Sequence, residues 1–231
     1  MAFTAIASLW LILPRALGSR LPRLAFGILC RAFGLIVEPM GLRPKSPALL
    51  LANHVSWTDI AVFAAITDTG FVAKREVRDW PFIGRLAERY GCLFIARDRR
   101  AAVGGETGQL ATLIRARSII LFPEGTTGDG QVLLPFRSSL IGAVATDARP
   151  CVPVALAYSW ADGRPLRSAG WAQVSWTGDA SLLPHVLNLA MLPPLRVRIL
   201  FGDTLTGTCR KALTQEAENQ IRTALVTSYG G

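Results

Sequence analysis

A histidine and an aspartate five residues apart are the residues whose types and spacing could carry chemistry in this chain. The segment Asn53-His54-Val55-Ser56-Trp57-Thr58-Asp59 holds one of only two histidines among 231 residues, and it directly follows the apolar run Leu49 to Ala52. A histidine whose ring is held by a carboxylate can accept a proton from a hydroxyl near neutral pH, because free imidazole has a pKa of about 6.5. His54 and Asp59 are therefore a candidate general base and its orienting group.

Helical geometry restricts where these two residues can lie. In one continuous α-helix, residues five apart point about 140° away from each other and do not touch. His54 is therefore expected in a turn at the carboxyl end of a strand, where open α/β sheets present their chemistry, and Asp59 in the first turn of the next helix. Ser56 is expected to cap that helix, with Asp59 at its third position. A capping box without catalysis would use the same residues, so both interpretations stay open at this point.

A second segment of interest follows the strand-like run Ile119 to Phe122. Pro123 ends the pairing, and three glycines in the six residues 125–130 permit positive φ angles and expose backbone N–H groups. Such a loop can wrap a phosphate or a glycerol through amide and threonine donors, while Glu124 can accept hydrogen bonds from substrate hydroxyls or hold the loop. An ordinary strand-to-helix connection is the alternative.

Four ordered blocks of this sequence resemble those of a known enzyme family. Asn53-His54-x-Ser56-x-x-Asp59 is similar to the first block and Phe122-Pro123-Glu124-Gly125-Thr126 to the third. The second block is matched by Lys74-x-Glu76 with Pro81, Gly84, Gly91 and Phe94-Ile95-x-Arg97, and the fourth by Val152-Pro153-Val154-Ala155. The family is that of the glycerolipid acyltransferases, the lysophosphatidate (1-acyl-sn-glycerol-3-phosphate) acyltransferases. The resemblance runs from about Leu49 to Leu156.

The resemblance implies acyl transfer from a thioester to the free hydroxyl of 1-acyl-sn-glycerol-3-phosphate, giving phosphatidic acid. The thioester, acyl-CoA or acyl carrier protein, would be a co-substrate, and no other cofactor is expected. His54 would be the general base and Asp59 its orienter, without a covalent intermediate. The expected acceptor-binding residues are Arg97, Glu124, Gly125, Thr126 and Thr127, with Lys74 and Arg137 as weaker cationic candidates.

Thr127 departs from the family pattern, in which arginine often follows Phe-Pro-Glu-Gly-Thr. The stretches Phe122 to Asp129 and Leu134 to Leu140 resemble a bacterial branch that includes lyso-ornithine lipid acyltransferases. Either Arg137 replaces the missing cation, or the acceptor lacks a phosphate. Lysophosphatidate is the first expected acceptor and lyso-ornithine lipid the alternative. A non-catalytic lipid-binding protein on the same fold is a second alternative.

Charge and hydropathy together indicate a lipid surface as the partner. Lys and Arg number 25 against 16 Asp and Glu, which gives a net charge of +9, and 51% of the residues are hydrophobic. A basic balance favours nucleic acid or anionic lipid, and so apolar a composition is unusual for a soluble nucleic-acid binder. We therefore expect membrane lipids and no nucleic acid. With two histidines and no CxxC we expect no metal site, and free thiols in a reducing compartment.

Residues 1–45 differ from the rest of the chain. Two apolar runs, Met1 to Leu13 and Leu24 to Val37, flank a stretch with three arginines. As helices at ~1.5 Å per residue they would be about 20 Å long, too short for a hydrocarbon core of about 30 Å. They predict a two-helix hairpin that dips into one leaflet, monotopic or peripheral, at the cytoplasmic face of a bacterial inner membrane. A helix pair packed on the catalytic domain, or one tilted span, is the alternative.

Residues 46–231 predict a single α/β acyltransferase domain, because strand-like and helix-like segments alternate as in a mostly parallel sheet covered by helices. The apolar helical stretch Leu182 to Leu192, which contains His185, is expected in the core, with an acyl-chain groove or a membrane rim as alternatives. His185 is expected to be a packed histidine. Predicted strands are Ala48 to Ala52, Gly70 to Lys74, Cys92 to Ala96, Ser118 to Phe122, Cys151 to Tyr158 and Leu195 to Phe201. Predicted helices are Asp59 to Ile66, Pro81 to Tyr90, Gly104 to Arg115, Ser138 to Thr146 and Thr214 to Val226.

Overall fold

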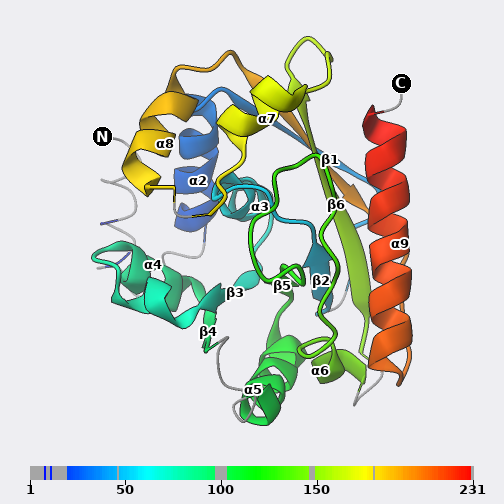
Figure 1. Cartoon of the computed structure of the whole chain (residues 1–231). Coiled ribbons are helices and arrows are strands. Elements are labelled where there is room, and N and C mark those ends of the chain that lie inside the picture. The colour runs from blue at the N-terminus through cyan, green and yellow to red at the C-terminus, as the bar shows by residue number, and fades with distance from the viewer. Residues whose placement is uncertain are drawn as a thin grey trace.

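A mostly parallel sheet runs through the centre of the protein (Figure 1). The computed structural model describes residues 8, 11, 20–45, 47–96, 103–145, 149–178 and 180–229. Within them the sheet has seven strands in the order β1-β7-β6-β2-β5-β3-β4, and β6 with β7 is its one antiparallel pair. The strands are β1 (Leu35–Met40), β2 (Leu49–Ala52), β3 (Gly70–Lys74), β4 (Leu93–Ile95), β5 (Ile119–Leu121), β6 (Cys151–Trp160) and β7 (Leu195–Phe201).

Helices cover both faces of this sheet. The helices are α2 (Leu21–Ala32), α3 (Thr58–Ile66), the 3₁₀ helix η1 (Arg75–Asp79), α4 (Ile83–Tyr90), α5 (Val103–Ala116), α6 (Gly142–Ala145), α7 (Ser168–Val174), α8 (Leu182–Ala190) and α9 (Arg210–Tyr229). Side chains of α2, α3, α4, α7 and α8 share one buried cluster, and those of α5, α6 and α9 share another. β2 contributes Leu50 and Ala52 to the first cluster and Leu49 and Leu51 to the second. A strand buried on both faces is a continuous apolar run, as the sequence shows.

The prediction of a mostly parallel α/β sheet is confirmed. All six predicted strands are present, and β3 and β7 have the predicted ends. The predicted helix Ser138 to Thr146 is shorter, Gly142–Ala145, and α7 is not among the predicted helices.

The N-terminal segment differs from its prediction. Residues 35–40 form β1, which pairs in parallel with β7, so the predicted apolar helix ends at Ala32 rather than Val37. Gly34, with a φ of 64°, makes the turn from α2 into β1. The buried residues Ala25 and Cys30 pack α2 onto the domain, which is the alternative expectation for this helix. The sheet therefore begins before residue 46.

The first predicted helix, Met1 to Leu13, lies outside the described residues except for residues 8 and 11. In the part of the chain that the structure describes, no helix has the length and apolar character needed to cross a membrane.

Asn53 fixes the point at which the chain leaves the sheet. Its buried side chain pairs with both backbone groups of Leu156 on β6: Oδ1 accepts from the N–H at 2.7 Å, and Nδ2 donates to the carbonyl at 3.1 Å. The amide thus continues the pairing of β2 with β6 by one residue. His54 follows directly at this anchored position.

We expect Asn53→Ala to lower the free energy of unfolding by about 2–4 kcal/mol, because it leaves two buried backbone groups of Leu156 unpaired. Urea denaturation measures the change. Asn219→Ala is the matched control, since that side chain is exposed and bonds only to Gln215 among the contacts described, and its effect should be below about 0.5 kcal/mol. Equal losses in the two variants would show that the Asn53 anchor does not stabilise this edge of the sheet.

Candidate active site

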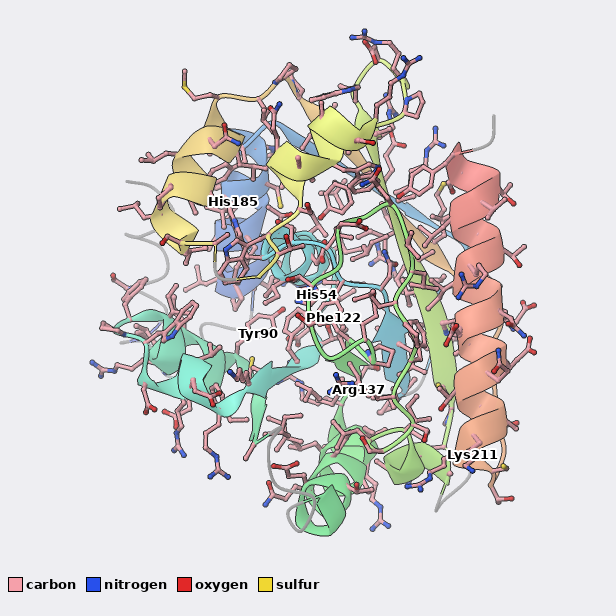
Figure 2. The ribbon with its side chains drawn as sticks, viewed as in Figure 1. His54, Tyr90, Phe122, Arg137, His185 and Lys211 are labelled. Atoms are coloured by element: carbon pink, nitrogen blue, oxygen red, sulfur yellow. The ribbon has the colours of Figure 1, made fainter. Side chains whose placement is uncertain are left out.

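His54 and Asp59 meet as predicted, the first in the turn after β2 and the second in the first turn of α3. His54 Nδ1 lies 2.7 Å from Asp59 Oδ2. Because a carboxylate oxygen accepts, Nδ1 carries the proton, and Nε2 keeps the lone pair that a base needs. The His54 side chain is 15% exposed and Asp59 is fully buried, so the imidazole is close to solvent and the carboxylate is not. Figure 2 shows His54 near the centre of the molecule, beside Phe122.

The Asp59 carboxylate has four donors. Besides the imidazole, Oδ2 accepts from the N–H groups of Val55 at 2.7 Å and Ser56 at 3.0 Å. Oδ1 accepts from the Tyr158 hydroxyl of β6 at 2.6 Å. A carboxylate removed from water needs hydrogen-bond donors from the protein, because its desolvation costs several kcal/mol. The donors therefore hold the loop, the ring and the strand around one buried group.

The start of α3 differs from the predicted capping box. The helix begins at Thr58, so Asp59 is its second residue, and the preceding Trp57 makes no side-chain cap. The Ser56 hydroxyl is buried and has no hydrogen-bond partner among the described residues. The predicted capping role of the Ser56 hydroxyl is wrong, because the Asp59 N–H that it would accept from donates to the Ser56 carbonyl at 3.1 Å. Only the reciprocal half of the capping box is present, in which Asp59 Oδ2 accepts from the Ser56 N–H.

The loop after β5 closes over the backbone of His54. Glu124 Oε1 accepts from the His54 N–H at 2.7 Å, and Gly128 N–H donates to the His54 carbonyl at 2.7 Å. Glu124 Oε2 accepts from Leu134 N–H at 3.0 Å. The imidazole stacks on Phe122, with ring centroids 3.9 Å apart and planes inclined by 14°. Glu124 therefore holds the loop, which is one of its two expected roles.

Burial raises the pKa of Glu124 from 4.5 to about 7. The N–H groups of His54 and Leu134 lower this pKa, and the charges of Asp59 and Glu218 raise it further. Desolvation is the largest of these effects, so this carboxyl group titrates near neutral pH.

Arg137 lies beside Gly125 of the same loop. Gly125 has a φ of 76°, and its N–H donates to the Phe122 carbonyl at 3.1 Å. A Cβ added at Gly125 would lie 3.3 Å from the guanidinium carbon of Arg137, so the side chain passes directly over the glycine. Both Arg137 and Thr126 are exposed. The structure thus brings three of the predicted acceptor-binding residues together (Arg137 in Figure 2).

Thr127 has a structural partner. Its hydroxyl donates to the Trp176 carbonyl, in the segment that follows α7. Trp176 N–H in turn donates to the Val55 carbonyl at 2.8 Å. The position at which arginine often stands in the family therefore ties the glycine-rich loop to the segment that borders the His54 loop.

Two further predicted residues are not joined to this site by the contacts described. Lys74, at the end of β3, is half exposed and lies 3.8 Å from Glu76. Arg97 lies outside the described residues.

Comparison with known proteins places these residues in a family. The Acyltransferase family profile matches residues 36–157, a range that contains both the His54 loop and the Glu124 loop. A lyso-ornithine lipid O-acyltransferase of Brucella abortus is 36% identical over 92% of this chain and 84% of its own length. The chain belongs to the acyltransferase family.

Other relatives of the acyltransferase carry two names. A lyso-ornithine lipid O-acyltransferase of Rhizobium meliloti is 36% identical over 87% of this chain and 71% of its own length. A 1-acyl-sn-glycerol-3-phosphate acyltransferase of Neisseria meningitidis is 31% identical over 78% and 70%. The crystal structure of the 1-acyl-sn-glycerophosphate acyltransferase PlsC from Thermotoga maritima shares the fold, with a TM-score of 0.65 at 16% identity over 96% of this chain and 87% of that chain.

Two contacts of the acyltransferase escape sequence reasoning. One is the bond that Tyr158 donates to Asp59. The available signal is a tyrosine in a largely apolar buried strand, since a buried hydroxyl needs a partner. His185 is a packed histidine as expected: Nδ1 accepts from Trp57 Nε1 at 3.1 Å and Nε2 donates to the Ser175 carbonyl at 3.1 Å. Burial lowers the pKa of His185, which favours this neutral form.

We expect Tyr158→Phe to lower kcat of the acyltransferase roughly tenfold with little change in KM, because a hydrogen bond to a charged group contributes about 1.5–3 kcal/mol. Burial and the nearby Asp59 raise the pKa of Tyr158 well above its ordinary value, so its hydroxyl remains a donor across the assay range. Release of free thiol from acyl-CoA measures the rate. Tyr90→Phe removes another buried hydroxyl, bonded to the Thr67 carbonyl, and should leave kcat unchanged. Equal losses in both variants would contradict an orienting role for Tyr158.

The pKa of Glu124 predicts a pH dependence of stability. Between pH 4.5 and about 7 the folded chain keeps a proton that the unfolded chain has lost. The stability contributed by Glu124 is therefore fully present below pH 4.5 and is lost as the pH rises through about 7. Relative to Glu124→Gln, the free energy of unfolding of the wild type should fall by roughly 3 kcal/mol over this range. Urea denaturation at a series of pH values measures it, with exposed Glu216→Gln as control; a constant difference from Glu124→Gln would be the opposing result.

Proposed function

We propose that this acyltransferase moves a fatty acyl group from a thioester, acyl-CoA or acyl carrier protein, to the free hydroxyl of a lysolipid. The observation that carries the proposal is the His54–Asp59 pair, in which the 2.7 Å contact at Nδ1 leaves Nε2 as the base at the exposed edge of the ring. The acceptor hydroxyl gives its proton to Nε2 while its oxygen attacks the thioester carbonyl. The carbon–sulfur bond then breaks, and the thiolate takes the proton back from the imidazolium. An ester and a free thiol result.

Lysophosphatidate (1-acyl-sn-glycerol-3-phosphate) is the first candidate acceptor, with phosphatidic acid as the product in phospholipid biosynthesis. Relatives that carry this name support it. The exposed guanidinium of Arg137 beside Gly125 also supports it, because a guanidinium can bind two phosphate oxygens at once. We assign to Arg137, Gly125 and Thr126 the binding of the acceptor headgroup. Glu124 and Thr127 instead hold the loop in place through their hydrogen bonds. Arg97 and Lys74 remain candidates for binding the same phosphate.

Lyso-ornithine lipid is the second candidate, and two observations favour it. Three relatives of that name match at 35–36% identity over 87–92% of the chain, against 30–32% identity over 78–83% for the relatives named for lysophosphatidate. In addition, Thr127 supplies no charge where arginine often stands, and its hydroxyl is already bonded to Trp176. An ornithine headgroup carries a carboxylate, which Arg137 can also bind in bidentate fashion.

The acyltransferase would act at an anionic membrane surface, at the cytoplasmic face of a bacterial inner membrane. The exposed arginines Arg23 and Arg31 of α2 suit lipid phosphates, and the apolar run Met1 to Leu13 suits insertion into one leaflet. In this proposal the run Met1 to Leu13 enters the leaflet, while α2 packs on the catalytic domain through its buried face and β1 belongs to that domain.

An acceptor panel tests the function. The purified full-length chain is given lysophosphatidate or lyso-ornithine lipid, each with acyl-CoA and with acyl carrier protein thioester, and the diacyl product is measured by mass spectrometry. We expect turnover of one or both lysolipids, and the ratio of the two kcat/KM values identifies the acceptor. Binding of both lysolipids without turnover by either donor would support the non-catalytic alternative.

Histidine variants control the same experiment. His54→Ala should lower kcat by about 10²–10⁴-fold, the usual contribution of a general base. His185→Gln, at the other histidine of the chain, should lose less than about tenfold, since a glutamine oxygen can still accept from Trp57. Full activity of His54→Ala would rule out the assigned base.

A further inference from the structure

The outer face of α8 is a row of exposed apolar side chains. Leu183, Leu187 and Met191 follow each other at intervals of four residues and are 68%, 61% and 85% exposed. On the opposite side, Leu189 is buried and His185 bonds to Trp57. The segment 181–195 contains no Asp, Glu, Lys or Arg. The expectation that this stretch is core is therefore wrong for one face, and such a cluster marks an interaction surface.

A second helix, α2, presents exposed cations and shares a buried cluster with α8. The exposed face of α2 carries Arg23, Leu24 and Arg31. Figure 1 shows α2 and α8 at the upper left of the molecule, on the side away from α9. Both helices contribute to one buried cluster, through Cys30 and Leu189. Apolar and cationic side chains are thus presented by two helices that pack on the same buried cluster.

Trp57 joins both helices to the active site. Its ring packs edge-on against Phe33 at the end of α2, with centroids 5.3 Å apart, and its Nε1 donates to His185 of α8. Trp57 stands three residues after His54 in the catalytic loop. Any surface that binds α8 therefore lies at a fixed position relative to the base.

We propose that the outer face of α8 is a membrane-docking surface, which inserts Leu183, Leu187 and Met191 among the acyl chains of an anionic bilayer. The arginines of α2 pair with the lipid phosphates beside it. Apolar residues for the hydrocarbon and cations for the headgroups are the combination that an anionic lipid surface requires. This surface is additional to the N-terminal run, and its binding is measured without turnover, so the result does not depend on the proposed acyl transfer.

A fluorescent reporter tests insertion directly. Cys209 is the exposed cysteine, whereas Cys30 and Cys151 are buried and Cys92 is half-buried. In a Cys209→Ser background, Leu187→Cys is labelled with nitrobenzoxadiazole, and Val226→Cys on α9 serves as the matched control. Vesicles of phosphatidylcholine with phosphatidylglycerol should shift the emission of the label at 187 to the blue and leave the label at 226 unchanged. No shift at 187 while the protein floats with the vesicles would overturn the proposal.

A triple variant measures the contribution to binding. Leu183→Gln, Leu187→Gln and Met191→Gln together should lower the partition coefficient of the full chain onto these vesicles by at least roughly tenfold, since a buried leucine or methionine contributes about tenfold or more. The control replaces three other exposed apolar residues, Met40, Leu42 and Val226, with glutamine and should partition as the wild type does.

Three results would contradict the proposal that the outer face of α8 binds lipid. The first is unchanged flotation of the α8 variant, and the second is an equal loss in the control variant. The third is a wild-type dimer in sedimentation without lipid that the α8 variant dissociates, which would assign the face to a second copy of the chain. Both variants should have the same thermal unfolding temperature as the wild type. A loss of flotation then comes from the altered surface and not from a disturbed fold.

Discussion

The hydrogen bonds to the buried Asp59 carboxylate are the interactions on which the candidate active site depends. A carboxylate without solvent must be given donors, and here they come from an imidazole, two loop N–H groups and a hydroxyl of β6. Each donor that satisfies the charge is also fixed by it. The loop conformation, the tautomer of His54 and the contact between α3 and β6 therefore follow from one electrostatic requirement.

The parallel sheet supplies the rigid base for this arrangement. β2 lies between β5 and β6 and is buried on both faces, and Asn53 extends its pairing to the residue before His54. The loops that follow β2 and β5 leave at the same edge because both strands run in parallel. Glu124 and Gly128 can therefore reach the backbone of His54, although 70 residues separate Glu124 from it in sequence.

Sequence reasoning could find the parts of the protein whose signal is local. The apolar run of β2 with the motif after it predicts a strand, a turn and a helix, and the His54–Asp59 contact follows from their geometry. β1 could not be found in this way, because its partly exposed residues follow an apolar helix without a break in hydropathy. The donor role of Tyr158 depends on a partner 99 residues distant in sequence, and the exposed row of α8 depends on which side of a helix without Asp, Glu, Lys or Arg the fold leaves uncovered.

The double pairing of the His54 backbone has a consequence for the evolution of specificity. Its N–H and carbonyl are both hydrogen-bonded, and its ring lies against Asp59 and Phe122, so the imidazole is ordered when the chain folds. Substrate binding then carries no entropic cost for ordering the His54 side chain. Arg137, which we propose binds the headgroup, is exposed and is not among these contacts, so it can change with the headgroup while the His54–Asp59 pair stays the same. One apparatus of this kind suits a family whose members differ in the lipid they acylate.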